Sequence, residues 1–215
     1  MHLKYIQKCR VCGNPNLTEV LDLHPQFSQG AFIVPNQKIS PSKRKIHNKL
    51  VRCNPQMYEG ACGLVQFNQS VPPEILYSSY FYRSSVSQTM RNHLKNIVDE
   101  GLILLVNFKG EIDDNKIVMD VAGNDLTLLK NYPDTFTRIC VDPSDITKEA
   151  AKSNPNITVI NKCFPCDEIL KFYSKIDLWS GIAFFYDIEN PIEFCKEIKG
   201  VLSYRGIGVL EFAYL

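Results

Sequence analysis

Short apolar runs alternate with helical repeats along the second half of the chain. Ile117–Val121 and Thr137–Val141 are rich in β-branched residues, a composition typical of strands buried on both faces of a parallel sheet. The residues between them, Ala122–Asp125, favour a turn, because glycine and asparagine accept backbone angles that other residues resist. A helix ending at Pro133 should follow this turn, with a core face formed by Leu126, Leu128, Leu129 and Tyr132. Together these elements predict one βαβ unit.

The same periodicities extend this α/β unit in both directions. They predict a fourth strand within Asp177–Asp187, a helix over Pro191–Leu202 and a fifth strand over Ile207–Phe212. A helix that Ser87 is placed to cap precedes the unit, with a core face of Met90, Leu94, Ile97 and Val98. Near the amino terminus, Val20–Leu23 and Gly30–Ile33 are expected to be short strands.

The predicted strand ends carry the candidate chemistry. Ligands of open parallel sheets bind at the carboxyl ends of the strands, where Asp120, the turn at 122–126 and Asp142 should meet. A carboxylate at the end of the second strand can accept both ribose hydroxyls, and the turn can donate backbone N–H groups. NAD and S-adenosylmethionine both fit, but the Gly-x-Gly-x-x-Gly that a pyrophosphate needs is missing. S-adenosylmethionine is therefore favoured; the alternative is a βαβ unit in which Asp142 is only a turn residue.

Eight cysteines favour metal binding or buried thiols over disulfides in a cytoplasmic protein. Cys9-x-x-Cys12-Gly is a knuckle that brings two thiolates to one ion, and Cys53 with Cys62-Gly forms a second pair. The second pair has a spacer of eight residues where two to four are usual, so it requires a looped-out insertion. Four buried cysteines, or His47 as a substitute ligand, are the alternatives. Cys163-x-x-Cys166 lacks a partner pair, and Cys140 and Cys195 are expected in the core.

Pattern, composition and charge limit the domain organisation of the chain and its possible partners. The pattern divides the chain into a zinc-binding domain at 1–70, a linker and helix at 71–110 and an incomplete Rossmann-like domain at 111–215. Net charge is only +1, so a nucleic-acid partner is not indicated. Basic residues gather before Gly60, notably at 42–45, where a solvated loop is favoured over a phosphate-binding surface. No signal peptide or membrane-length apolar run occurs, which predicts a cytoplasmic protein without a membrane partner.

Several motifs in a fixed order resemble the S-adenosylmethionine-dependent C-methyltransferases of nucleotide sugars. The resemblance spans nearly the whole chain and rests on Cys9-x-x-Cys-Gly13, Cys62-Gly-Leu-Val-Gln66, Val71-Pro-Pro-Glu74, Tyr80-x-Tyr82-x-Ser-Ser-x-Ser-x-Thr-Met90, His93, Gly123-Asn-Asp125, Val141-Asp-Pro143 and Gly208-Val-Leu-Glu-Phe212. It implies a zinc-binding domain, a class I methyltransferase domain and a keto-deoxysugar nucleotide as substrate. Cofactor contacts are then expected from Asp120, Ala122, Gly123, Asn124, Asp125 and Asp142, with zinc on Cys9, Cys12, Cys53 and Cys62.

The departures from the family pattern are local. Ala122 and Leu126 stand where similar proteins have glycines, so Ala122 should keep a negative φ and Leu126 should face the approaching cofactor. Similar proteins have a histidine after the fourth strand. In this chain the segment after that strand, which ends at Asp187, has other residues in its place. The remaining catalytic candidates are Tyr80, Tyr82, His93 and Asp187.

The family has a further carboxy-terminal domain, which predicts a fragment, a decayed relative or a split enzyme completed by another chain. A non-catalytic zinc-stabilised interaction module is the competing hypothesis, and a nicotinamide-linked enzyme is disfavoured.

Overall fold

The computed structural model describes residues 3–27, 45–57, 59–72, 76, 77, 80–110 and 112–213. The chain forms two compact units, Met1–Leu76 with Glu189–Ile192, and Tyr77–Ile188 with Glu193–Leu215. The strand expected at Gly30–Ile33 and most of the basic run at 42–45 lie outside the described residues. Within the described ranges, none of the helices has the length and apolar character that a bilayer-spanning segment needs.

The first unit is built from antiparallel strands. Strand β2 (Leu17–Phe27) pairs with β3 (Lys45–Cys53), which pairs with β4 (Val65–Phe67), and β1 (Lys4–Tyr5) pairs with β5 (Gln69–Ser70). The strand predicted at Val20–Leu23 is thus part of a longer one. Among the described residues of this unit, the buried apolar side chains are Cys9, Ile46, Val51 and Cys53. So small a core agrees with the expectation that a metal stabilises this region.

The second unit contains a five-stranded sheet in the order β10-β9-β6-β7-β8, and every pairing is parallel. Its strands are β6 (Ile117–Val121), β7 (Thr137–Val141), β8 (Ile157–Ile160), β9 (Ile176–Ile182) and β10 (Leu202–Glu211). From the central strand β6, the chain first adds β7 and β8 on one edge and then β9 and β10 on the other. This reversal creates a topological switch point between β6 and β9.

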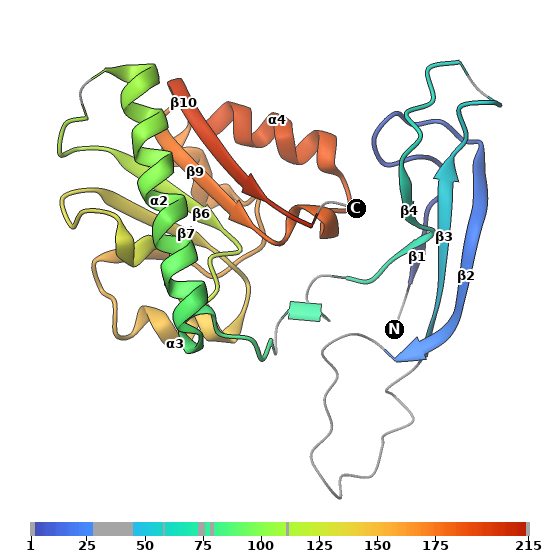
Figure 1. Cartoon of the computed structure of the whole chain (residues 1–215), viewed down its shortest axis with the longest axis horizontal. Helices are drawn as coiled ribbons and strands as arrows, with labels where there is room; N and C mark the ends of the chain where they lie inside the picture. Colours follow the sequence, from blue (N-terminus) through green and yellow to red (C-terminus); the bar gives the residue numbers. More distant parts are fainter. Residues whose placement is uncertain are drawn as a thin grey trace, which may run out of the picture. The chain divides into compact units, whose positions relative to one another are not determined.

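Two helices cover opposite faces of this sheet (Figure 1). Side chains alternate between the faces, so Val118 packs in the same core as α2 (Gln88–Lys109), and Met119 packs in the core of α4 (Pro191–Val201). The Ser87 hydroxyl accepts the Met90 N–H, which confirms the predicted cap of α2. Shorter helices are α3 (Asp145–Ala151) and the 3-10 turns η1 (Ser84–Val86), η2 (Leu129–Asn131), η3 (Asp167–Phe172) and η4 (Phe185–Asp187).

The helix predicted over residues 126–132 is wrong. The chain forms turns followed by the short η2, because Ala122, Asn124 and Leu126 have φ values of 60°, 51° and 67°. A run of left-handed residues cannot nucleate a right-handed helix, and the Asp125 carboxylate captures the N–H and hydroxyl of Thr127. Leu126, Leu128 and Leu129 are nevertheless buried. The apolar pattern therefore predicted their burial correctly and their secondary structure incorrectly.

Cys140 and Cys195, both expected in the core, differ in their exposure to solvent. Cys140 is fully buried on β7. Cys195 is exposed, because α4 turns Phe194, Ile198 and Val201 toward the sheet and presents the residue after Phe194 to solvent. The prediction of a buried Cys195 is therefore wrong.

Candidate functional site

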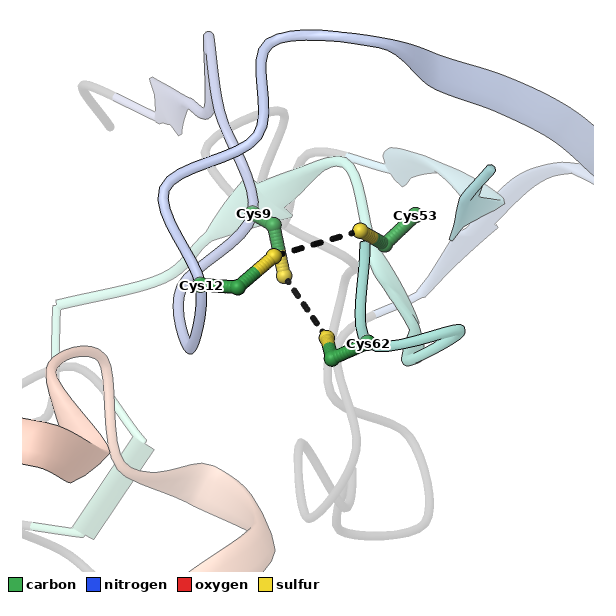
Figure 2. A group of neighbouring side chains, drawn as sticks. All are labelled: Cys9, Cys12, Cys53 and Cys62. Atoms are coloured by element: carbon green, nitrogen blue, oxygen red, sulfur yellow. Dashed lines mark hydrogen bonds between the residues drawn. The ribbon is translucent and has the colours of Figure 1, made fainter. Parts of the chain in front are cut away.

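Four cysteine sulfurs converge in the first unit. Figure 2 shows Cys9 and Cys12 facing Cys53 and Cys62, with sulfur-to-sulfur distances of 3.5 Å for Cys9 to Cys62 and 3.4 Å for Cys12 to Cys53. All four sulfurs lie within 4.8 Å of one another. Four thiolates about 2.3 Å from a tetrahedral zinc ion would be separated by about 3.8 Å. The geometry therefore fits zinc, and the loop between Cys53 and Cys62 accommodates the unusual spacer.

The surroundings of these sulfurs favour thiolates at Cys9 and Cys12 and disfavour one at Cys62. Burial raises the pKa of Cys9, but backbone N–H groups of Cys12 and Val11 outweigh it, so the pKa is lowered overall. The backbone N–H groups of Asn14 and Cys62 lower the pKa of Cys12. Burial raises the pKa of Cys62 to about 12, and the neighbouring thiols add to this effect. Thiolates this close together repel one another, and a bound cation removes that repulsion.

A side-chain donor and a backbone turn support the cluster. Asn14 is buried and donates from Nδ2 to the Cys53 sulfur over 3.3 Å. Gly13, directly after the first pair, has a φ of 73°, which glycine adopts without strain. His47 is not part of the cluster, because its Nε2 lies 2.6 Å from Asp22 Oδ1. The alternative of His47 as a substitute ligand to this centre is therefore wrong.

A second candidate site lies in the second unit at the carboxyl ends of β6 and β7. Asp120 is paired with Cys140 in the register of these strands, and the turn at 122–125 and Asp142 follow directly. Asp142 is buried and accepts the Asn124 N–H at 2.9 Å and the Ser144 N–H at 2.7 Å. The sequence-predicted group of Asp120, the turn and Asp142 is thus brought together in space.

Asp120 is a buried carboxyl group with an unusual proton affinity. Burial raises its pKa to about 7, and the negative charge of Asp142 contributes to the rise. The Ser180 hydroxyl of β9 donates to Asp120 Oδ1 over 2.6 Å and opposes it. Sequence reasoning missed Ser180, although a lone serine inside an apolar strand is a signal of a buried polar partner.

The turn after β6 is tightly constrained. A Cβ atom on Gly123 would lie 2.6 Å from the Cys140 sulfur and 2.9 Å from Asp120 Oδ2, so only glycine fits. Ala122 has a positive φ, contrary to the expectation of a negative one. Leu126 does not face the crevice as expected, because its side chain is fully buried in the core shared with α2. The N–H groups of Ala122, Asn124 and Leu126 are all bonded within the protein.

A polar segment before α2 is tied to this turn. Asn124 donates from Nδ2 to the Tyr82 carbonyl and accepts the Ser84 N–H, and Asp125 accepts the Ser85 N–H at 2.9 Å. Burial disfavours ionisation of Asp125, but hydrogen bonds from Ser85 and Thr127 leave its pKa lowered overall. Tyr82 is thereby held beside the turn through its backbone.

Asp187 is surrounded by tyrosines. The Tyr77 hydroxyl donates to Asp187 Oδ2 over 2.6 Å. Burial raises the pKa of Asp187, although the Tyr77 hydrogen bond opposes this. Burial and the Asp187 charge raise the pKa values of Tyr77, Tyr80 and Tyr186, so the tyrosines remain protonated. Tyr77 and Tyr186 were not among the predicted catalytic residues.

His93 belongs to a different pair. Its Nε2 lies 2.7 Å from Glu211 Oε2, which links α2 to the carboxyl end of β10. Both side chains are about half exposed. Of the four predicted catalytic residues, Tyr80 lies near both Asp187 and Tyr82, and His93 pairs with a residue that was not predicted.

Comparison with known families and structures identifies one segment. A family model named for methyltransferases and described as "Putative zinc binding domain" matches residues 9–77. This segment contains all four clustered cysteines. No curated protein matches the chain.

Several solved structures are similar to parts of the chain. The plantazolicin methyltransferase BpumL, solved with a pentazolic desmethylPZN analogue and SAH, is 18% identical with a TM-score of 0.42, over 54% of this chain and 45% of that one. The PH0226 protein from Pyrococcus horikoshii OT3 is 22% identical with a TM-score of 0.45, over 62% of this chain and 59% of that one. A precorrin-6y C5,15-methyltransferase from Geobacter metallireducens GS-15 is 10% identical, with a TM-score of 0.42 and coverages of 62% and 67%. The chain spans less than half the length of BpumL.

Replacing Cys9 by serine should release zinc. We expect the parent protein to carry close to one zinc ion and Cys9→Ser to carry far less, because one thiolate of a four-sulfur site is lost. Cys195→Ser is the matched control, since that thiol is exposed and outside the cluster. Elemental analysis of the purified proteins measures the metal content. Equal zinc in parent and Cys9→Ser would contradict the assignment.

Replacing Asp120 by asparagine should change how stability depends on pH. A carboxyl whose pKa is raised on folding destabilises the native state as pH rises from about 4, the unfolded value, to about 7. Between pH 5 and pH 8 the parent should therefore lose about 2 to 3 kcal/mol of unfolding free energy relative to Asp120→Asn. Urea unfolding followed by fluorescence of the single tryptophan, Trp179, measures this difference. An identical pH dependence in both proteins would contradict the raised pKa.

Proposed function

We propose that this chain is an S-adenosylmethionine-dependent methyltransferase unit with a structural zinc centre. One observation carries the proposal: an acid ending β7, an acid near the end of β6 and a glycine turn converge beside the β6/β9 switch point. Ligands of open parallel sheets bind at this place. The missing dinucleotide glycine pattern favours a nucleoside whose tail has no pyrophosphate over NAD.

Asp142 is proposed to hold the ribose. Its two carboxylate oxygens accept the Asn124 and Ser144 N–H groups, which fixes the side chain at the end of β7. Each oxygen has a further lone pair, so the fixed carboxylate can also accept the two ribose hydroxyls. Asp120, Ala122, Gly123, Asn124 and Asp125 are proposed to border the methionine part of the cofactor.

Asp187 is proposed as the base of the reaction. S-adenosylmethionine, when bound, supplies an electrophilic methyl group. The acceptor is proposed to be a keto-deoxysugar nucleotide, in which the carbon beside the keto group must lose a proton to become a nucleophile. Burial raises the pKa of Asp187, which makes this carboxylate a stronger base than an exposed aspartate. The Tyr77 hydroxyl orients it, and Tyr80, Tyr82 and His93 are proposed to border the sugar.

The cell compartment and the partners are proposals of the same kind. The free thiols of the four-cysteine cluster support a reducing cytoplasm. A second polypeptide chain is proposed to contribute to the substrate side, following the resemblance to nucleotide-sugar C-methyltransferases.

A non-catalytic, zinc-stabilised interaction module is the second candidate. It is favoured by the turn after β6, where the N–H groups of Ala122, Asn124 and Leu126 are bonded within the protein. Binding of S-adenosylmethionine distinguishes the two candidates, because a non-catalytic interaction module is not expected to bind the cofactor.

Replacing Asp142 should weaken cofactor binding. We expect Asp142→Ala to reduce the affinity for S-adenosylhomocysteine about 100-fold, because two buried ribose hydroxyls lose their acceptor. Asp145→Asn, an exposed residue in the first turn of α3, should leave the affinity within about twofold. Isothermal calorimetry measures both, and thermal melting verifies that each variant is folded. Unchanged affinity in a folded Asp142→Ala protein would refute the placement.

Replacing Asp187 should impair methyl transfer rather than cofactor binding. With labelled S-adenosylmethionine and a panel of keto-deoxysugar nucleotides, we expect Asp187→Asn to reduce the rate about 100-fold or more, because the base is lost. Tyr77→Phe should reduce it by a smaller factor, and Tyr204→Phe, an exposed residue on β10, should have no effect. A fully active Asp187→Asn protein would exclude this carboxylate as the base.

A further inference from the structure

A second group of metal-binding side chains lies in the first unit, on the pair of strands β2 and β3. The ligand atoms of Asp22, His24 and His47 all lie within 4.8 Å of one another. His47 Nε2 is 2.6 Å from Asp22 Oδ1, and His24 Nδ1 is 3.5 Å from the same oxygen. The two imidazole rings have centroids 6.5 Å apart and planes tilted by 31°. Two imidazoles therefore converge on one carboxylate.

A backbone irregularity creates this convergence. Asp22 pairs with Lys49 and Pro25 pairs with His47, so two residues of β2 oppose only Asn48 of β3. His24 lies in this bulge with a φ of 58°, a left-handed conformation that few non-glycine residues adopt. Its N–H donates to Asp22 Oδ1 over 2.7 Å. Bulges re-aim side chains, and here the bulge brings His24 beside His47.

We propose that Asp22, His24 and His47 bind a divalent transition-metal ion. Two imidazoles and one carboxylate form a ligand set that suits zinc and other first-row divalent metals and leaves coordination positions for water. A tetrahedral zinc ion would separate its nitrogen and oxygen ligands by about 3.3 Å. The 3.5 Å separation already fits, and the 2.6 Å hydrogen bond must open by less than about 1 Å, a shift that partly exposed side chains allow.

This site is separate from the four-cysteine cluster and weaker than it. His47 and Cys53 are six residues apart on one strand, which corresponds to about 20 Å. The exposed fractions of the His24 and His47 side chains are 82% and 43%, so an ion can enter and leave from solvent. Lys49 Nζ lies 3.4 Å from Asp22 Oδ2 and 2.8 Å from Glu19 Oε2, and its charge repels a cation bound nearby.

The experiment titrates zinc into the full chain after the cysteine cluster has been saturated. Calorimetry should detect a second equivalent, and NMR should show the His24 and His47 ring signals shifting with it. His24→Gly is the decisive variant, because glycine suits the left-handed backbone while it removes one ligand. We expect His24→Gly and His47→Gln each to weaken the second equivalent by at least about 10- to 100-fold. Lys49→Met should strengthen it roughly threefold to tenfold.

Two controls separate this proposal from general histidine or thiolate binding. His93→Gln should leave the second equivalent unchanged, because that histidine is on α2 in the other unit. The first, cysteine-bound equivalent should remain in His24→Gly, as measured by elemental analysis. Absence of a second equivalent in the parent, or its persistence in folded His24→Gly, would overturn the proposal.

Discussion

The simultaneous pairing of β6 with β7 on one edge and β9 on the other is the constraint on which the second unit depends. Parallel pairing forces the carboxyl ends of all three strands to one side of the sheet. It therefore brings Asp120 beside Ser180 of β9 and places Asp142 next to the turn after β6. The contact between Asp120 and Ser180 would not exist if the chain added all its later strands on the β7 side of β6.

The same arrangement has an energetic cost at the site. Asp120 is buried with one hydroxyl partner and a nearby carboxylate, and Ala122 and Leu126 occupy backbone conformations that glycine adopts more easily. Local strain and perturbed proton affinity gather at functional sites more often than elsewhere. In the first unit the cost is different, because four thiols lie close together with few buried apolar neighbours. A bound cation resolves that conflict.

Local patterns predicted much of this fold. The strands β6 and β7, the helices α2 and α4 and the convergence of four cysteines follow from periodicity and motif spacing, which the printed sequence contains. The helix predicted at 126–132 does not form, although its apolar residues recur at helical spacing. The Asp125 carboxylate accepts the Thr127 N–H, and residues before and within the segment have left-handed backbone angles. The Tyr77–Asp187 bond joins residues 110 positions apart, and the imidazole pair depends on a bulge. No single-sequence pattern encodes such tertiary contacts.

The proposed function depends on the binding of an adenosine-containing cofactor at the switch point beside β6. An amide NMR titration of the isotope-labelled chain with S-adenosylhomocysteine tests it most directly, because it reports where the ligand binds without requiring a methyl acceptor. We expect saturable shifts centred on Gly123–Asp125 and Asp142–Ser144, with the amides of β2 and β3 unaffected. No shifts at saturating ligand, or shifts confined to other parts of the sheet, would contradict it.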